Sequence, residues 1–224
     1  MLPHNVNLRN WQSRIRIQLV DTKNYIIGRK TNARYFLPYA LHHMQIIQHW
    51  LSQASHVHSP NFDDRADPDD ISLLVIHCIS LPPGEFGNDC IDQLFCNQLN
   101  PDGHPYFKEI HQLTVSSHLV IKRTGEIVQY VPFDKRAWHA GQSSYEGREG
   151  CNDFSIGIEL EGTETTPYTA AQYLELAAVV KTLLEAYPRL SAERITGHSD
   201  IAPGRKTDPG ESFGWQKFYC LLGK

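Results

Sequence analysis

The sequence has no apolar run near the roughly 20 residues that a transmembrane helix needs, so we do not expect a membrane protein. Residues 1–7 do not show a basic segment followed by an apolar one, which argues against a secretory signal peptide. The five cysteines include no CxxC pair, and an odd number does not fit a disulfide framework. These absences favour reduced, mostly buried thiols and a cytoplasmic protein.

An excess of positive charge is absent as well. Lys and Arg number 21 against 25 Asp and Glu, which gives a net charge of −4 at neutral pH. Surfaces that bind nucleic acid are basic, so nucleic acid is not expected as the main partner. A chain of 224 residues is long enough for one sizeable domain with an appendage. We expect a monomer that acts on a small molecule.

The apolar pattern predicts a single α/β domain with a central mixed β-sheet flanked by helices. The continuous apolar run over 71–79 has the length of a buried central strand. Segments 117–122 and 126–133 are expected to form a hairpin that turns at Thr124 and Gly125.

Alternation over 154–160 predicts a further strand with two unlike faces. The apolar face holds Phe154, Ile156, Ile158 and Leu160, and the polar face holds Ser155, Gly157, Glu159 and Glu161. Burying a carboxylate such as Glu159 is costly unless it has a partner or a function.

Helices are predicted over 89–99, from Thr169 to Tyr187, and over 213–222. The middle helix has the clearest boundaries, because Thr169 and Gln172 make a capping box and Pro188 follows its last residue. Residues 56–70 are rich in Asp and Pro and are predicted to form a loop.

Three parts of the chain follow from this pattern. Residues 1–43 form an N-terminal extension of unknown role, with strands expected at 15–20 and 25–27. Residues 44–70 form a lead-in segment and loop, and residues 71–222 form the domain that carries the chemistry.

The extension raises a question about the natural start of the protein. Met1 and Met44 are the two methionines, and the domain-like sequence begins almost at Met44. We hypothesise that Met44 is the natural start, or that the extension is an appendage. Mass spectrometry of the native protein checks the first version, which a peptide from residues 1–43 would exclude.

The loop over 196–210 is the segment richest in chemical groups. It carries His198, Lys206 and Asp208, it is stiffened by two prolines, and it turns at two glycines. Catalytic zinc sites use three protein ligands and an open fourth position, and His and Asp are both zinc ligands. His77, at the end of the apolar run, is the best candidate for the third ligand.

The remaining parts of a zinc hydrolase can also be assigned. Glu159 is the candidate general base, and Lys206 is the candidate cation that stabilises a developing oxyanion. Taken singly, these residues carry little weight. A lone His77 is more often a hydrogen-bonded core histidine, and Asp208 before Pro209 is a common start of a turn.

A resemblance adds to this interpretation. Residues 71–220 resemble the type 2 N-acetylmuramoyl-L-alanine amidase family, and most of all its cytosolic branch. The resemblance runs through the blocks 73–77, 79–87, 104–107, 115–118, 125–141, 151–162 and 196–210. It implies a zinc-dependent amidase that cleaves the bond between anhydro-N-acetylmuramic acid and L-alanine of muropeptides during cell-wall recycling.

The resemblance also implies a role for individual residues. His77, His198 and Asp208 match the zinc ligands. Glu159 matches the catalytic carboxylate, and Lys206 matches the cation that steadies the tetrahedral intermediate.

Several other residues have roles that the sequence leaves open. His118 and His139 are candidates to line the cleft, and Trp138 is a candidate wall or a packing residue. Asn152 is a candidate to orient backbone near the site, and Arg205 is interpreted as a solvated charge.

One departure from the family pattern concerns the peptide. Members carry Arg where this chain has Thr114 and Gly150, and arginine suits a peptide carboxylate. Arg148 is the candidate to compensate.

Three other kinds of protein are alternatives. A muropeptide-recognition module without catalysis would lack one or more ligands, and this chain has all three. An amidase acting on intact peptidoglycan would call for a signal, a wall-binding repeat or a basic surface. A thiol hydrolase using Cys151 would need a group that activates the thiol.

Overall fold

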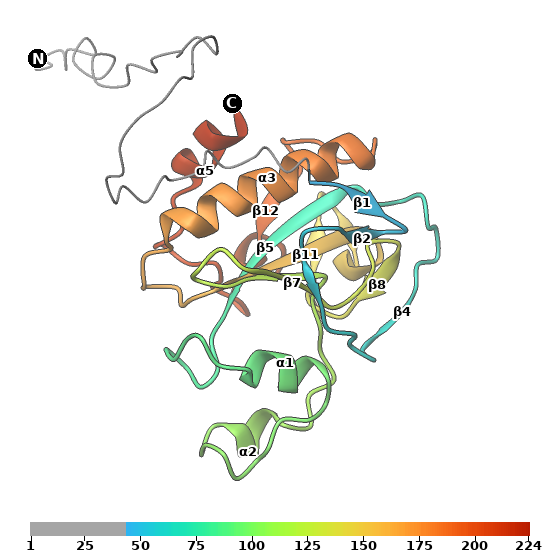
Figure 1. Cartoon of the computed structure of the whole chain (residues 1–224). Helices are drawn as coiled ribbons and strands as arrows, with labels where there is room; N and C mark the ends of the chain where they lie inside the picture. The colour runs from blue at the N-terminus through green and yellow to red at the C-terminus, as the bar shows by residue number, and fades with distance from the viewer. Residues whose placement is uncertain (1–43) are drawn as a thin grey trace, which may run out of the picture. The chain divides into compact units, whose positions relative to one another are not determined.

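The computed structural model describes residues 44–224, so the strands expected at 15–20 and 25–27 lie outside the described residues. A six-stranded mixed sheet runs through the domain (Figure 1). Its strand order is β12-β5-β11-β6-β7-β3. Its strands are β3 (Ser55–His56), β5 (Leu73–Ile79), β6 (Leu119–Ile121), β7 (Ile127–Gln129), β11 (Ser155–Glu161) and β12 (Ile195–Gly197). Strands β12, β5, β11 and β6 are mutually parallel, and β7 is antiparallel to β6. The predicted α/β class with a mixed sheet is confirmed.

Shorter elements surround the sheet. They are β1 (Ile46–Ile47), β2 (Trp50–Leu51), β4 (Phe62–Asp64), β8 (Lys135–Ala137), β9 (Ser144–Tyr145), β10 (Arg148–Glu149), the 3-10 helix η2 (Cys151–Asp153) and α4 (His198–Ile201). The remaining helices are α1 (Cys90–Phe95), α2 (Phe107–Ile110), α3 (Ala170–Ala186) and α5 (Trp215–Leu222). In Figure 1, α3 and α5 lie on one side of the sheet, and α1 and α2 lie at the opposite end of the domain. No helix of residues 44–224 has the length and apolar character needed to cross a membrane.

The predicted hairpin is present as β6 and β7. The backbone N–H of Lys122 donates to the oxygen of Glu126 at 2.8 Å, and Gly125 closes the turn with a φ of 90°. That backbone conformation is accessible to glycine at little cost, which explains why the turn falls there.

Helix α3 begins as its sequence predicts. Thr169 Oγ1 accepts from the N–H of Gln172, and Gln172 Oε1 accepts from the N–H of Thr169, both at 3.1 Å. Gln172 Nε2 also donates to the backbone oxygens of Ile121 and Glu161, which ties the start of the helix to the sheet.

The other two predicted helices are shorter than expected. Helix α1 ends at Phe95, because Asn97 adopts a left-handed conformation with a φ of 58° that no helix can continue through. Helix α5 starts at Trp215, two residues later than predicted, with Gly214 as its N-cap.

Each face of the sheet packs in its own cluster. Leu74, Ile76, Ile156, Ile158 and Leu160 pack with the buried side of α3. Cys78 packs against this cluster, as alternation opposite His77 predicts, and burial raises the pKa of its thiol to about 12.

Phe154 is not where the alternation predicts. It precedes β11 and packs with Leu73, Val75 and Ile201 on the other face of the sheet. The strand begins one residue later, so the backbone of Phe154 does not follow the pleat that the alternation assumes.

Residues 56–70 are only partly the loop that their composition predicts. Strand β4 pairs antiparallel with β8, and Arg65 beside it is buried. Its guanidinium donates to the backbone oxygens of Phe133, Asn152, Asp153 and Ser155. Burial lowers the pKa of Arg65 to about 10. The loop-like composition of residues 56–70 does not predict the burial of Arg65, because the oxygens that accept its hydrogen bonds belong to backbone far away in the sequence.

Candidate active site

Strand register brings the first two candidate residues together. Strands β5 and β11 are parallel neighbours, and Glu159 lies directly opposite His77. Gly197, the last residue of β12, pairs with Ile76, so His198 follows immediately beyond the strand. Ligand sites of open α/β sheets form at the carboxyl ends of parallel strands, where these three residues lie.

Asp208 reaches the same place because its loop folds back. The backbone N–H of Ser199 donates to the oxygen of Asp208 at 2.9 Å. Gly204 and Gly210 turn the loop with φ values of 77° and 82°, so the turning positions predicted from the sequence are confirmed.

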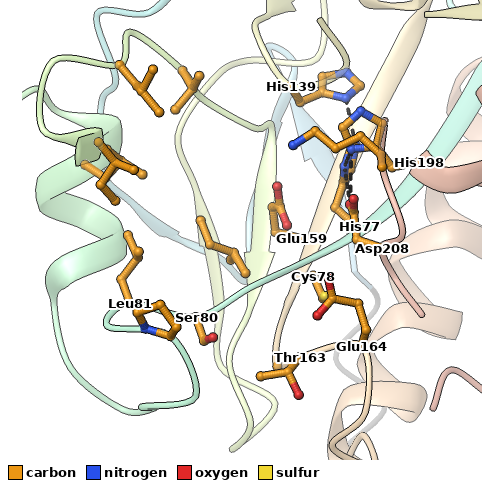
Figure 2. A pocket seen from close by; sticks show the side chains of 18 of the residues that line it. His77, Cys78, Ser80, Leu81, His139, Glu159, Thr163, Glu164, His198 and Asp208 are labelled. Carbon is orange, nitrogen blue, oxygen red and sulfur yellow. Dashed lines mark hydrogen bonds and ion pairs between the residues drawn. The ribbon is translucent and has the colours of Figure 1, made fainter. Parts of the chain in front are cut away.

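His77, His198 and Asp208 form a buried triangle of ligand atoms (Figure 2). The Nδ1 atoms of the two histidines are 3.0 Å apart, and each is 3.1 Å from Asp208 Oδ2. Atoms that lie about 2.1 Å from a tetrahedral zinc are about 3.4 Å from one another. The triangle is only slightly tighter, so its two imidazoles and one carboxylate fit a zinc ion.

The protonation of the triangle suits a cation. Burial lowers the pKa of His77 to about 4, so its ring is neutral near pH 7. Burial would raise the pKa of Asp208, but its close contacts with the imidazoles of His198 and His77 outweigh this effect, and the pKa lies below its ordinary value. At neutral pH the site therefore offers a neutral His77 and an ionised carboxylate.

Glu159 lies beside the triangle and has an unusual environment. The residue is 9% exposed, and its Oε2 is buried without a hydrogen-bond partner in the described chain. Burial, with the charge of Asp208 adding to it, raises the pKa of Glu159 well above the ordinary value. Lys206 opposes that shift. An unpaired buried carboxyl group aimed at a cavity is typical of a proton-transfer residue.

Lys206 is exposed at the cavity and forms no ion pair with any residue of 44–224. Its ammonium is therefore available to a negative charge in the cavity. Arg205 beside it is also exposed, but the interpretation as a merely solvated charge is wrong. Its Nη2 donates to the backbone oxygens of Ala140 and Gln142, each at 2.6 Å.

The triangle opens into a cavity of about 550 Å³. Its lining includes the candidate catalytic residues and also apolar residues, among them Leu81, Phe95, Ile110 and Val115. Trp138 lines the cavity, and its Nε1 is buried without a partner in the described chain.

The two other candidate histidines differ in position. His139 lines the cavity, as predicted, and its ring contacts His77. His118 does not line it. It is fully buried behind the site, where Nδ1 accepts from the N–H of Gly157 and Nε2 lies 3.0 Å from the backbone oxygen of Lys135.

The predicted backbone role of Asn152 is confirmed, because its Oδ1 accepts from the N–H groups of His139 and Ala140. Arg148 does not compensate for the missing arginines, since it pairs with Asp70 at 2.5 Å and lies outside the residues that line the main cavity. Glu161 accepts from the backbone N–H groups of Gly87 and Arg123, so it supports loops beside the site.

Two contributors are missed by sequence reasoning. The carbonyl of Ala140 contacts His198 Nε2 at 3.1 Å, and no sequence signal points to a backbone oxygen. Gly157 does carry a signal, because a glycine inside a strand often marks a close approach. A Cβ there would lie 2.5 Å from Cγ of His139.

Two histidines and an aspartate that converge at the ends of parallel strands, next to an unpaired glutamate, are typical of a metallohydrolase. The described chain thus has a three-residue site able to hold a metal ion. Comparison with known proteins identifies the family.

The pattern of the N-acetylmuramoyl-L-alanine amidase family matches residues 67–211. The chain is 61% identical over 173 residues to the 1,6-anhydro-N-acetylmuramyl-L-alanine amidase AmpD of Enterobacter cloacae, which covers 77% of this chain and 92% of that protein. It is 59% identical over 181 residues to AmpD of Escherichia coli K12, covering 81% and 98% respectively. The chain therefore belongs to the N-acetylmuramoyl-L-alanine amidase family and is an enzyme of that kind.

Solved structures agree with this assignment. A crystal structure of a selenomethionine derivative of AmpD matches with a TM-score of 0.78 and 60% identity, over 80% of this chain and 99% of that one. AmiD of Escherichia coli, in complex with anhydro-N-acetylmuramic acid-L-Ala-D-gamma-Glu-L-Lys, matches with a TM-score of 0.51 and 28% identity. That match covers 72% of this chain and 65% of AmiD.

Proposed function

We propose that this enzyme is a zinc-dependent amidase that cleaves the amide between anhydro-N-acetylmuramic acid and L-alanine of muropeptides during cell-wall recycling. The observation that carries the proposal is the triangle of His77 Nδ1, His198 Nδ1 and Asp208 Oδ2 beside the unpaired Glu159. The names of the AmpD relatives support the substrate, and the AmiD complex supports an anhydromuropeptide as the kind of ligand that this fold accepts.

His77, His198 and Asp208 would hold the ion, which supplies Lewis acidity at the reacting carbonyl when bound. Glu159 takes a proton from the attacking water as the new carbon–oxygen bond forms. The same carboxyl passes that proton to the nitrogen of L-alanine as the carbon–nitrogen bond breaks. Lys206 faces the negative charge that develops on the carbonyl oxygen. The products are the free lactyl acid of the sugar and the free amino terminus of the peptide.

We place the enzyme in the cytoplasm as a monomer. The five cysteines, all within the described chain, are free thiols, which fits a reducing compartment. Arg205 and Lys206 line the cavity, and two neighbouring cations are too few to form a general basic surface that binds intact peptidoglycan. We therefore favour a small muropeptide over intact peptidoglycan.

The proposal is tested by incubating the purified protein with an anhydromuramyl tripeptide and following the products by mass spectrometry. We expect release of the free tripeptide, loss of release after treatment with a chelator, and recovery on adding back zinc. Binding of the muropeptide without release would instead support a recognition module. Release that a chelator leaves unchanged would contradict the metal dependence.

A further inference from the structure

Two consecutive residues, His139 and Ala140, contact the two histidines of the triangle from outside it. His139 Nδ1 lies 2.9 Å from His77 Nε2, and the backbone oxygen of Ala140 lies 3.1 Å from His198 Nε2. In each ring the contact is made by the nitrogen that does not belong to the triangle. We propose that His139 and the Ala140 carbonyl fix the tautomers of the two ligand rings, and that Asn152 positions this dipeptide. The inference rests on the proposed function.

Hydrogen-bond directions can be assigned from Ser155 onward. Its hydroxyl donates to the backbone oxygen of Cys151 at 2.6 Å, so its single proton is committed there. The Ser155 oxygen is 3.2 Å from His139 Nε2 and must accept from it. In the neutral ring, His139 therefore carries its single proton on Nε2, and its Nδ1 is an acceptor.

This assignment determines the state of His77. Because His139 Nδ1 accepts, His77 Nε2 must be the donor of the contact between them. A neutral imidazole has one N–H, so His77 Nδ1 carries a free lone pair inside the triangle. His139 thus selects the form of His77 that can ligate a metal.

The tautomer of His198, the second ligand, is determined by one contact with a backbone oxygen. A carbonyl oxygen can only accept, so His198 Nε2 carries a proton, and in the neutral ring its Nδ1 is left bare. Arg205 donates to the same Ala140 oxygen, which links the carbonyl to the loop that bears Asp208.

Asn152 and Gly157 hold the dipeptide in place. Asn152 is buried, and its Oδ1 accepts from the N–H of His139 at 3.2 Å and from that of Ala140 at 2.8 Å. The ring of His139 lies so close to Gly157 that any side chain there would collide with it. The ring and the carbonyl therefore reach the two ligands from one fixed piece of backbone.

Outer partners of this kind orient ligand rings and preset their protonation, and their loss typically lowers metal affinity 10- to 100-fold. The test compares two variants of equal size in the full-length protein. In His139→Asn, the side-chain oxygen replaces Nδ1 as an acceptor at nearly the same distance from the backbone. In His139→Leu, a methyl group takes that position and cannot accept.

The readout is the zinc dissociation constant, measured by competition with a chelator. We expect His139→Leu to bind zinc about 10- to 100-fold more weakly than the wild type, and His139→Asn to recover most of that loss. Equal weakening in both variants would reduce His139 to a packing residue and overturn the inference. So would an unchanged affinity in His139→Leu.

A second measurement needs no variant. Long-range ¹H–¹⁵N NMR spectra of the zinc-loaded protein report which ring nitrogen of His139 carries the proton. We expect a neutral ring protonated at Nε2, and a ring protonated at Nδ1 or at both nitrogens overturns the inference. The wild type separates the two proposals. If it binds no zinc, the proposed function fails, whereas tight binding with the wrong His139 tautomer leaves that function intact.

Discussion

Replacing Glu159 with Gln is expected to abolish most turnover while zinc stays bound. The change removes the proton acceptor but leaves His77, His198 and Asp208 in place. General acid–base catalysis typically contributes about 10²- to 10⁴-fold, so kcat should fall by that order. The measurement is hydrolysis of an anhydromuramyl tripeptide together with zinc analysis of the same sample.

The folded state should tolerate this change. Glu159 Oε2 has no hydrogen-bond partner in the described chain, and its raised pKa shows that the buried site disfavours the charge. A neutral amide of the same shape therefore costs little free energy of unfolding. Near-normal turnover in Glu159→Gln would disprove the mechanism.

Glu161 supplies the matched control for that experiment. It lies two residues further along β11 and is also buried, but its carboxylate accepts from the N–H groups of Gly87 and Arg123. We expect Glu161→Gln to keep turnover close to the wild-type value while its melting temperature falls. Comparing Glu159→Gln with Glu161→Gln distinguishes the effect of losing the proton acceptor from the general effect of losing a buried carboxylate.

Much of the scaffold could be predicted because local sequence patterns determine it. The apolar run of β5, the turn at Gly125 and the capping box at Thr169 depend on residues close in the chain, and each is confirmed. The helices predicted at 89–99 and 213–222 exist but begin or end differently. There the limits depend on a left-handed Asn97 and on packing, which periodicity does not encode.

The candidate site was only partly accessible from sequence. His77 and Glu159 lie side by side because their two parallel strands pair in that register. The sequence pattern predicts both strands but not their register. The contact that the Ala140 carbonyl makes with His198 comes from the backbone and has no side-chain signature. Arg65 shows the same limit, since a segment of loop-like composition sends a guanidinium into the interior to bind four distant carbonyls.

Replacing Asp208 is expected to release the zinc ion, whereas replacing Glu159 should leave it bound. Asp208 contributes the one formal negative charge of the triangle, and its lowered pKa keeps it ionised at neutral pH. In Asp208→Ala, two histidines remain, which is fewer than the three protein ligands of a catalytic zinc site. We expect zinc affinity to fall by more than the roughly 100-fold that loss of an outer partner can cost.

The measurement is the zinc content of Asp208→Ala after dialysis, followed by an assay over a series of added zinc concentrations. Activity should be lost after dialysis and should recover only in part at high zinc. Asp208→Asn keeps a side-chain oxygen without the charge, so its zinc affinity should fall between those of the wild type and Asp208→Ala. An Asp208→Ala protein that retains one zinc at wild-type affinity would show that the ion is held elsewhere. We expect Glu159→Gln to bind zinc but to lack turnover, and Asp208→Ala to lack both. This pair of results would separate proton transfer from metal binding within one cavity.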